Sequence, residues 1–560
     1  MLLRYVYLWR RHRRVDRFLA GTRHARQAQR DVLFSKIRRN EESDFGREWG
    51  FHDIHTVEDF RRRMPLTTYE DYLPYIERVK QGEISAMFGP GARVLMFALT
   101  SGTTDKAKYI PITDHFMEEY RRGWNLWGLR AYHDHRRLLR LLNLQLTSDW
   151  RQFYTEGGIP CGNISGLAAE TAPLISRPIF VIPRALMKIT DPLAKHYTAL
   201  RLTMARRRVG VVMTANPSTL IEFAKLGDRR RESLIRDIYN GTLSDEVDVS
   251  SPVRLALKRR TSVRRPKRAR ELESIIERTG SLHPKDYWTR LQILAVWTGG
   301  SVGAYLPRLK EYFGDLPVRD HGLSASEGRI TLPLEDNTSA GVLDYTSQYF
   351  EFIPEEEHGS DQPTVLEGHE LQEGKKYFVI LTTSSGFYRY DIHDLVECTG
   401  FEGEAPLLKF LNKGAHFSSV TGEKISEFQV SMAVQRGFED LGLPFDLFTV
   451  APRWGDPPGY VLLVEPGDHM ARAGELAGRI DRHLGELNCE YEDRLTTRRL
   501  RPLEIQEIPA GVWAAFRSDR IQRQGGSMEQ YKHPCLTNDF EFIQRLEQFG
   551  CSKPSMSPNA

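Results

Sequence analysis

A loop rich in hydroxyl groups, residues 100–108, carries the residue types best suited to chemistry. It reads Thr-Ser-Gly-Thr-Thr-Asp-Lys-Ala-Lys and follows an apolar run at 94–99, which predicts a buried strand that ends at the loop. Because glycine lets backbone N–H groups converge on one oxygen, while hydroxyls and lysine add donors and charge, this composition favours polyphosphate binding. We expect the phosphate-binding residues to be Ser101, Gly102, Thr103, Thr104 and Lys108. The alternative is an ordinary Ser/Thr-rich turn, and no Walker motif closes the loop.

A second loop, residues 320–328, contains a lone carboxylate among hydroxyl residues. It reads Asp-His-Gly-Leu-Ser-Ala-Ser-Glu-Gly, and the turn Trp-Thr-Gly-Gly-Ser at 297–301 precedes it. Mg²⁺ prefers oxygen ligands and is usually held by one or two carboxylates together with phosphate oxygens, so we expect Glu327 to bind this ion. The other nucleotide-binding residues expected here are Gly300, Ser324, Ala325 and Ser326. The alternative is a Glu that caps a helix.

A third segment, residues 386–396, alternates aromatic and charged residues before an apolar continuation. Asp394 suits a ribose, because one carboxylate accepts two hydrogen bonds and a vicinal diol offers two. Arg389 could offset the negative charge of a phosphate or of a substrate carboxylate. Alternation by itself indicates a half-buried strand, and such a strand usually does nothing but pack.

The order and spacing of these segments resemble the adenylate-forming superfamily, and within it the plant auxin-responsive acyl acid amido synthetases and their bacterial relatives. That family has a TSGTT-type loop ending in Lys, a YGxSEG-type turn, a YRYRxGD-type strand and a C-terminal QYKxPR. The resemblance extends from about residue 40 to residue 536. The segments of this chain that carry it are 60–72, 100–108, 323–328, 388–394, 410–427 and 530–534.

The resemblance implies an ATP-dependent ligase. A carboxylate would attack the α-phosphate of ATP to give an acyl-adenylate and pyrophosphate, and an amino-acid amine would then displace AMP, which gives an N-acyl amino acid. It further implies catalytic roles for Lys532, Lys108 and Arg389, and contacts with the nucleotide from Asp394, Phe410 and Lys424. Two alternatives stay open. An acyl-CoA ligase or other adenylate-dependent acyl transferase would use the same first half-reaction, and a catalytically degenerate adenylate-binding protein would catalyse neither half-reaction.

Four departures from the family pattern keep the degenerate alternative open. Asp105 stands in place of a Gly, Leu323 in place of an aromatic residue near the adenine, His393 in place of a Gly, and Cys535 in place of an Arg. A negative charge at Asp105 is unfavourable beside phosphates unless a lysine or the metal offsets it.

The elements that must position these segments alternate between strands and helices. The pattern predicts an α/β fold with a large N-terminal adenylate-forming domain of mixed sheets and helices at 1–410, and a small mobile α+β C-terminal lid domain at 411–560. Runs at 211–217 and 291–297 read as strands that end in turns, where open α/β sheets bind ligands. Beyond residue 413 the order is β-β-α-β.

Composition favours an ordinary soluble enzyme. The 560 residues, 40% of them hydrophobic, can bury a large core in more than one domain. Five scattered cysteines without a CxxC pair favour a reducing compartment, and no apolar run approaches the length of a membrane span, so we expect a cytoplasmic monomer without membrane insertion. The net charge of +4 argues against a nucleic-acid partner, and the basic run at 258–270 is expected to be a solvated surface.

The acyl substrate can be given only as a class, a small aromatic or aliphatic carboxylic acid. Segments 116–132 and 152–165 correspond roughly to where the family places its acyl-binding residues. The aromatic side chains at Trp124, Trp127 and Tyr132 have helical spacing, however, which is more often typical of a core. His321 and His393, which lie within the motifs, could act as general bases toward an amine.

Overall fold

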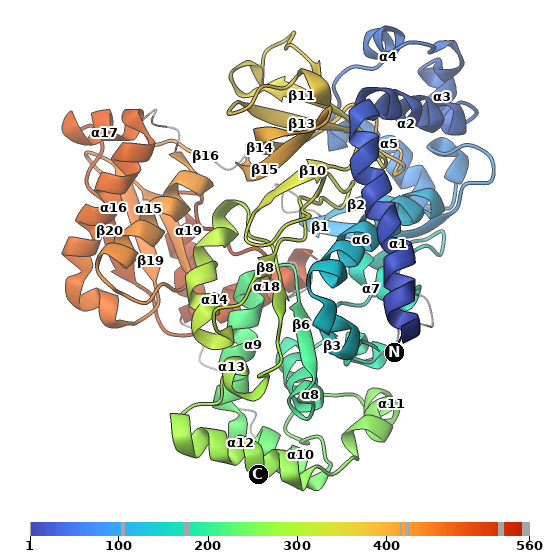
Figure 1. Ribbon diagram of the computed structural model, residues 1–560. Coiled ribbons are helices and arrows are strands. Elements are labelled where there is room, and N and C mark those ends of the chain that lie inside the picture. The colour runs from blue at the N-terminus through green and yellow to red at the C-terminus, as the bar shows by residue number, and fades with distance from the viewer. Residues whose placement is uncertain are drawn as a thin grey trace.

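The computed structural model shows the expected mixed α/β fold, with a separate C-terminal domain beside the larger body (Figure 1). It describes residues 2–101, 107–172, 179–414, 417–421, 423, 425–524 and 531–550. Within these residues, no helix is long and apolar enough to cross a membrane.

The N-terminal helices pack on the outside of the larger body. α1 runs along α6, and a short 3-10 turn at Thr22–His24 separates α1 from α2 (Figure 1). Capping boxes start α4 at Thr56 and α5 at Thr68, so each helix has its first N–H groups satisfied. The bounds are α1 Leu2–Gly21, α2 Ala25–Asn40, α3 Asp44–Glu48, α4 Val57–Arg63, α5 Tyr69–Lys80 and α6 Asp114–Asp134.

A hairpin carries the hydroxyl-rich loop. Its two antiparallel strands place Thr100 opposite Lys108, and residues 102–106 between them lie outside the described part of the chain. The hairpin belongs to a four-stranded sheet of order β2-β1-β5-β4. The bounds are β1 Val94–Ser101, β2 Ala107–Thr113, β4 Phe153–Tyr154 and β5 Pro160–Gly162.

A four-stranded parallel sheet of order β3-β6-β7-β8 forms the centre of the larger body. Helices cover it, and its middle strands are apolar along their whole length, as buried parallel strands are. Its strands are β3 Leu142–Gln145, β6 Val209–Met213, β7 Ile293–Ala295 and β8 Val318–Arg319. Its helices are α7 Ile164–Glu170, α8 Pro192–Met204, α9 Pro217–Arg229, α10 Arg231–Asn240, α11 Ser251–Thr261, α12 Pro266–Thr279, α13 Pro284–Tyr287 and α14 Leu306–Phe313.

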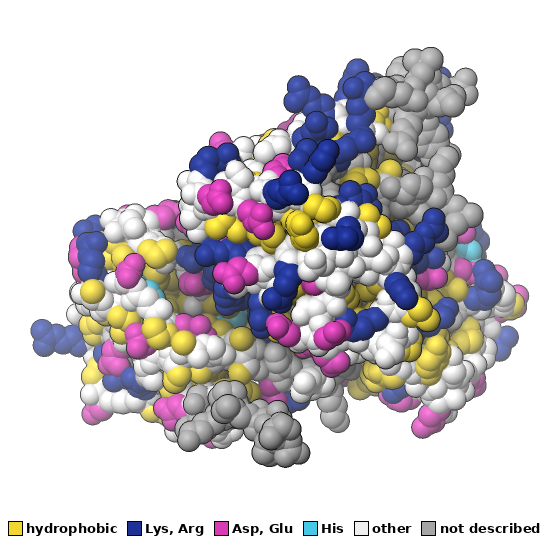
Figure 2. All heavy atoms as spheres, turned by 90° about the horizontal axis from the view of Figure 1, so that it is seen from below, with side chains coloured by type: hydrophobic (Ala, Val, Ile, Leu, Met, Phe, Trp, Pro, Cys, Tyr) yellow, Lys and Arg dark blue, Asp and Glu magenta, His cyan; other side chains and the backbone are white. Residues whose placement is uncertain are grey.

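The basic run lies on α11 and α12, at the end of the molecule that faces the viewer in Figure 2. Lys and Arg recur over this face with Asp and Glu among them, as expected of a solvated surface (Figure 2). Two residues of the run differ from that expectation. Arg268 is buried and donates to the carbonyls of Met204 and Tyr287, and Arg260 lines the large cavity described below.

A seven-stranded antiparallel sheet of order β12-β11-β13-β14-β15-β10-β9 carries the third motif. Asp394 on β14 pairs in register with Lys413 on β15, which places a carboxylate and an ammonium group side by side. The bounds are β9 Thr331–Leu332, β10 Ala340–Leu343, β11 Tyr349–Pro354, β12 Leu366–Glu367, β13 Lys376–Thr382, β14 Tyr390–Glu402 and β15 Ala405–Lys413. The residue pair 410/411, at which the domain boundary is expected, lies within β15.

The C-terminal domain has the predicted β-β-α-β order and its own apolar core. β18 and β19 are antiparallel, and β20 joins β19 in parallel after a helical crossover. The strands are β16 Phe417–Ser418, β17 Ile425–Ser426, β18 Phe448–Arg453, β19 Gly459–Val464 and β20 Glu504–Glu507. The helices are α15 Glu427–Asp440, α16 Ala473–Leu487, α17 Cys489–Thr496, α18 Val512–Gln524 and α19 Phe542–Gly550.

Candidate functional site

A cavity of about 980 Å³ lies where the parallel sheet, the seven-stranded sheet and the C-terminal domain meet. Its size suits a ligand larger than a single small acid. The structure brings to its wall most of the predicted site residues that it describes, from segments more than 400 residues apart in sequence. These are Lys108, Ser324, Ala325, Ser326, Glu327, Asp394, Phe410 and Lys532.

A chain of polar contacts joins the first two motifs. Lys108 Nζ donates to Tyr390 Oη at 3.3 Å, and Tyr390 Oη donates to Glu327 Oε1 at 3.3 Å. Burial lowers the pKa of Lys108 and the Glu327 carboxylate opposes this effect. Glu327 is buried, and Tyr390 donates to only one of its two carboxylate oxygens, Oε1. The carboxylate therefore fits a site in which one protein carboxylate and the phosphate oxygens of a nucleotide bind Mg²⁺ together. Sequence reasoning missed Tyr390, which reads there as a packing residue.

Asp394 is a buried carboxylate with spare hydrogen-bonding capacity. Its Oδ1 atom has no hydrogen-bond partner in the described structure, and Lys413 Nζ lies 4.0 Å from it. Burial raises the pKa of this carboxyl, while Lys413 and Lys532 act in the opposite direction. An unsatisfied buried acceptor is costly, so the site fits a ligand that donates hydrogen bonds here, as a ribose diol would.

Lys532 extends from the C-terminal domain into the cavity. Its Nζ atom lies 4.9 Å from the ring centroid of Trp297 and 5.5 Å from that of Phe410. Burial lowers its pKa, and the carboxylates of Asp394 and Glu427 raise it. The neighbouring backbone is tied to the larger body, because Asn216 Nδ2 donates to the Tyr531 carbonyl at 2.7 Å. In this structure, the C-terminal domain therefore lies against the larger body with Lys532 at the predicted nucleotide site.

Gly300 supports the ring of Phe410 from behind. Its φ of +64° lies in the left-handed region, and a Cβ atom at this position would lie 2.9 Å from Phe410 Cε1. Glycine is therefore required both by the backbone conformation and by the close approach of the ring. Gly300 acts by positioning Phe410, which lines the cavity, and lies behind the wall formed by Gly299 and Phe410.

Arg389 does not reach the cavity, which corrects the expectation that it offsets charge on the substrates. Its φ is +50°, and this turn directs the guanidinium away from β14 into the protein. Arg389 Nε donates to Glu351 Oε2 at 3.0 Å, and its Nη1 donates to the Met64 carbonyl at 2.8 Å. Both side chains of the ion pair are almost fully buried. Arg389 therefore holds the N-terminal helices against the seven-stranded sheet.

We predict that Arg389→Ala lowers the free energy of unfolding by about 1.5–3 kcal/mol, because it removes buried charge-assisted hydrogen bonds while Arg61 stays paired with Glu351 at 2.9 Å. Denaturant unfolding measures the change. The exposed Arg93, which pairs with Asp114 at 3.2 Å, offers a matched control, and Arg93→Ala should change stability by less than about 0.5 kcal/mol. An Arg389→Ala protein of unchanged stability that has lost activity would contradict the structural role.

Several predicted residues lie outside what the structure describes. They are Gly102, Thr103, Thr104, Asp105, Lys106 and Lys424, together with the side chain of Ser101. Their predicted contacts with phosphates and nucleotide therefore stay predictions. The two strands that flank the loop reach the cavity, since Leu99 and Lys108 both line its wall.

The far end of the cavity is aromatic. Trp124, Trp127 and Tyr132 on α6 line it, although their spacing also fits a core, and Ile164 and Ser165 add part of the second expected acyl-binding segment. His321 is buried between the two tryptophans, with ring centroids 5.2 Å and 5.8 Å away.

Burial, together with the nearby Arg329 charge, lowers the pKa of His321 to about 3. It is therefore neutral near pH 7, and its Nε2 atom has no partner in the described structure. The surrounding walls favour an apolar or aromatic group at this end of the cavity.

The family departures that the structure describes have local explanations. His393 has a φ of +56°, which is the conformation for which glycine is the usual residue. Leu323 keeps an apolar side chain at the cavity wall, and Cys535 is buried in the core of the C-terminal domain. The backbone N–H of Cys535 donates to Glu427 Oε1 at 2.8 Å, so this position stays anchored without an arginine.

Comparison with known families matches nearly the whole chain to three consecutive models. They are the GH3 family N-terminal domain at 14–318, the GH3 family central domain at 341–413 and the GH3 family C-terminal domain at 428–541. The last two models are separated by residues 414–427, which follow β15.

Curated relatives match over almost their full length. Indole-3-acetic acid-amido synthetase GH3.3 of Arabidopsis thaliana is 25% identical, over 96% of this chain and 94% of that protein. Jasmonoyl--L-amino acid synthetase JAR6 of Nicotiana attenuata is 24% identical, over 93% and 92%. The solved structure of GH3.15 acyl acid amido synthetase has a TM-score of 0.83 at 22% identity and covers 95% of both chains, which shows a shared fold.

Proposed function

We propose that this chain, which belongs to the GH3 family, is an ATP-dependent acyl acid amido synthetase. It adenylates a small carboxylic acid and transfers the acyl group to the amine of an amino acid, with release of pyrophosphate and AMP. The single observation that carries this proposal is the convergence of Lys108, Asp394 and Lys532 on one cavity whose wall also includes aromatic residues of α6.

The first half-reaction needs positive charge around the phosphates. Carboxylates and amines do not condense at neutral pH, so the carboxylate is activated by attack on the α-phosphate of ATP. Charge that develops on the phosphates would be stabilised by Lys108 and Lys532, both of which line the cavity. Because Lys532 comes from the C-terminal domain, the placement described here favours a role in adenylation.

The nucleotide is held at its ribose and base. Asp394 Oδ1 would accept from the ribose hydroxyls, and this satisfies the buried acceptor. Leu323 and Phe410 give the base apolar and aromatic neighbours at the wall. With the C-terminal domain over the cavity, water is kept from the reactive acyl-adenylate, which would otherwise hydrolyse.

The metal ion and the cellular compartment are proposed from different observations. Glu327 would hold Mg²⁺ together with the ATP phosphates, where the ion would neutralise charge on the departing pyrophosphate. We also propose a cytoplasmic monomer; the four cysteines that the structure describes are free, which supports a reducing compartment.

A substrate panel tests the proposed function. The purified protein is incubated with ATP, Mg²⁺ and a set of aromatic and aliphatic acids, with mixed amino acids or coenzyme A, while pyrophosphate and product mass are followed. Acid-dependent pyrophosphate release together with an N-acyl amino acid is the expected result. A thioester would support the ligase instead. If no acid in a broad panel gives pyrophosphate release although the protein binds ATP measurably, the catalytically degenerate alternative is supported.

A further inference from the structure

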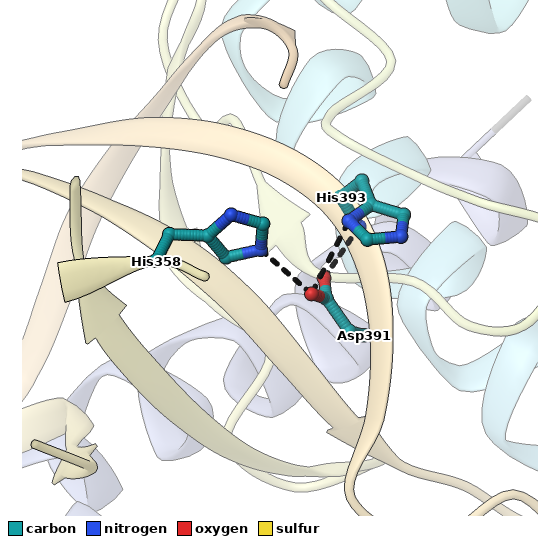
Figure 3. Close-up of side chains that lie close together, drawn as sticks. All are labelled: His358, Asp391 and His393. Atoms are coloured by element: carbon teal, nitrogen blue, oxygen red, sulfur yellow. Dashed lines mark hydrogen bonds and ion pairs between the residues drawn. The ribbon is translucent and has the colours of Figure 1, made fainter. Parts of the chain in front are cut away.

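Two histidines and an aspartate converge beside the nucleotide motif (Figure 3). His358 Nε2 lies 2.7 Å from Asp391 Oδ2, and His393 Nδ1 lies 3.2 Å from the same oxygen. His358 follows a short 3-10 turn after β11, whereas Asp391 and His393 lie on β14. The fold therefore brings three side chains with metal-binding atoms together from two separate segments, with all of those atoms within 4.8 Å of one another.

The side chains are held in place by contacts outside the trio. Asp391 Oδ1 accepts the backbone N–H of His393 at 2.7 Å, which leaves Oδ2 directed at the two imidazoles (Figure 3). The ring of His358 stacks on Phe378, with ring centroids 3.6 Å apart. Such support is typical of metal sites, where neighbouring groups fix the orientation of each ligand.

His393 adopts a backbone conformation that a histidine rarely takes. Its φ of +56° is disfavoured for residues with a Cβ, and such strain costs on the order of 1–3 kcal/mol and is concentrated at functional sites. This conformation turns the imidazole back toward Asp391, so that Nδ1 faces the carboxylate. A glycine would relieve the strain but remove the ligand.

Two of the distances between ligand atoms can be compared with those around a four-coordinate ion. Zn²⁺ bonds to nitrogen and oxygen at about 2.0–2.1 Å, which places tetrahedral ligand atoms about 3.3 Å apart. The 3.2 Å separation at His393 is already close to this value, and the 2.7 Å separation at His358 needs a small opening. His393 is half-exposed and lines the large cavity, so an ion has a path of entry from the cavity.

We propose that His358, Asp391 and His393 form a binding site for a divalent transition-metal ion of the Zn²⁺ type. Two imidazoles and one carboxylate are a donor set that suits Zn²⁺, whereas Mg²⁺ prefers oxygen donors. This site is distinct from the Mg²⁺ site proposed at Glu327, which offers only oxygen. The ion would join the loop after β11 to β14 immediately before Asp394, and so would stiffen the segment that carries the ribose-binding carboxylate.

Metal titration of the full-length protein tests the proposal without any activity assay. Protein freed of metal with a chelator is titrated with Co²⁺, whose visible spectrum reports tetrahedral ligation, and Zn²⁺ affinity is measured by competition with a chromophoric chelator. We expect one ion per chain, and a loss of affinity of at least about tenfold in His393→Gly and in His358→Gln. Because His393→Gly relieves a strained φ, it should fold at least as well as the parent protein.

His135 provides the matched control. It lies 2.7 Å from Asp336 but is not part of any group of three possible ligands among the described residues, so His135→Gln should bind Co²⁺ and Zn²⁺ like the parent protein. The proposal is overturned if the parent protein binds neither ion, or binds no more tightly than His393→Gly, or if His135→Gln loses binding equally. In those cases the trio is a hydrogen-bonded cluster only. None of these outcomes bears on whether the chain makes N-acyl amino acids.

Discussion

Lys532→Ala should slow acid-dependent pyrophosphate exchange by about 10²- to 10³-fold and leave ATP affinity little changed. The reason is positional. Lys532 Nζ reaches the cavity from the C-terminal domain and lies over the rings of Trp297 and Phe410, so its charge is available where the phosphates are expected. A charge that acts on the transition state lowers the rate of its own step when it is removed, more than it lowers binding.

The control for Lys532 is a lysine on the surface. Lys310 pairs with Asp315 at 3.0 Å and is largely exposed, and Lys310→Ala should leave both half-reactions unchanged. Transfer from preformed acyl-adenylate to the amine is measured separately in each variant. If Lys532→Ala leaves adenylation and transfer at parent rates, the lysine has no part in the mechanism. If it slows transfer alone, the assignment to adenylation is wrong.

Asp394→Asn should weaken ATP binding about 10- to 100-fold, which is the second large effect. Hydrogen bonds to a charged acceptor contribute about 1.5–3 kcal/mol, and the amide replaces one of the two acceptor oxygens of the carboxylate with an NH₂ donor and removes its charge. The substitution keeps the volume of the side chain, and it also removes the buried charge near Lys413. Equilibrium binding of a non-hydrolysable ATP analogue measures the change.

Two comparisons make the Asp394 result specific. Asp315→Asn, at an exposed carboxylate, should bind the analogue like the parent protein. A 2′,3′-dideoxy analogue should bind the parent protein more weakly than the ribose form, but should bind Asp394→Asn with little further loss. An analogue affinity in Asp394→Asn equal to that of the parent would show that this carboxylate does not contact the ribose.

Sequence reasoning located the site where local residue types determine the chemistry. A buried carboxylate on a strand, as at Asp394, and a lysine that follows a glycine-containing loop, as at Lys108, have few structural uses, and both line the cavity. The order β18-β19-α16-β20 in the C-terminal domain was also predictable from its apolar runs and one amphipathic helix, whereas the other helices of this domain were not predicted.

The failures arose where the backbone departs from a regular element. The charge of Arg389 and the family resemblance gave it a role toward the substrates, but its φ is +50° and its guanidinium is held in the interior by Glu351 and the Met64 carbonyl. Tyr390 was missed because a phenol that bridges Lys108 and Glu327 has the same sequence pattern as one that only packs. Trp124 and Trp127 fit a core pattern, and only the tertiary arrangement shows that the same helix face also forms a cavity wall.

Oxygen transfer from substrate to AMP tests the adenylation chemistry most directly. With an acid from the substrate panel labelled with ¹⁸O in its carboxylate, attack on the α-phosphate leaves one labelled oxygen on AMP after the amine has displaced it. We predict ¹⁸O-labelled AMP together with an N-acyl amino acid that retains the other labelled oxygen. Unlabelled AMP, with the label found in inorganic phosphate or only in the acid, would contradict an acyl-adenylate intermediate and with it the proposed function.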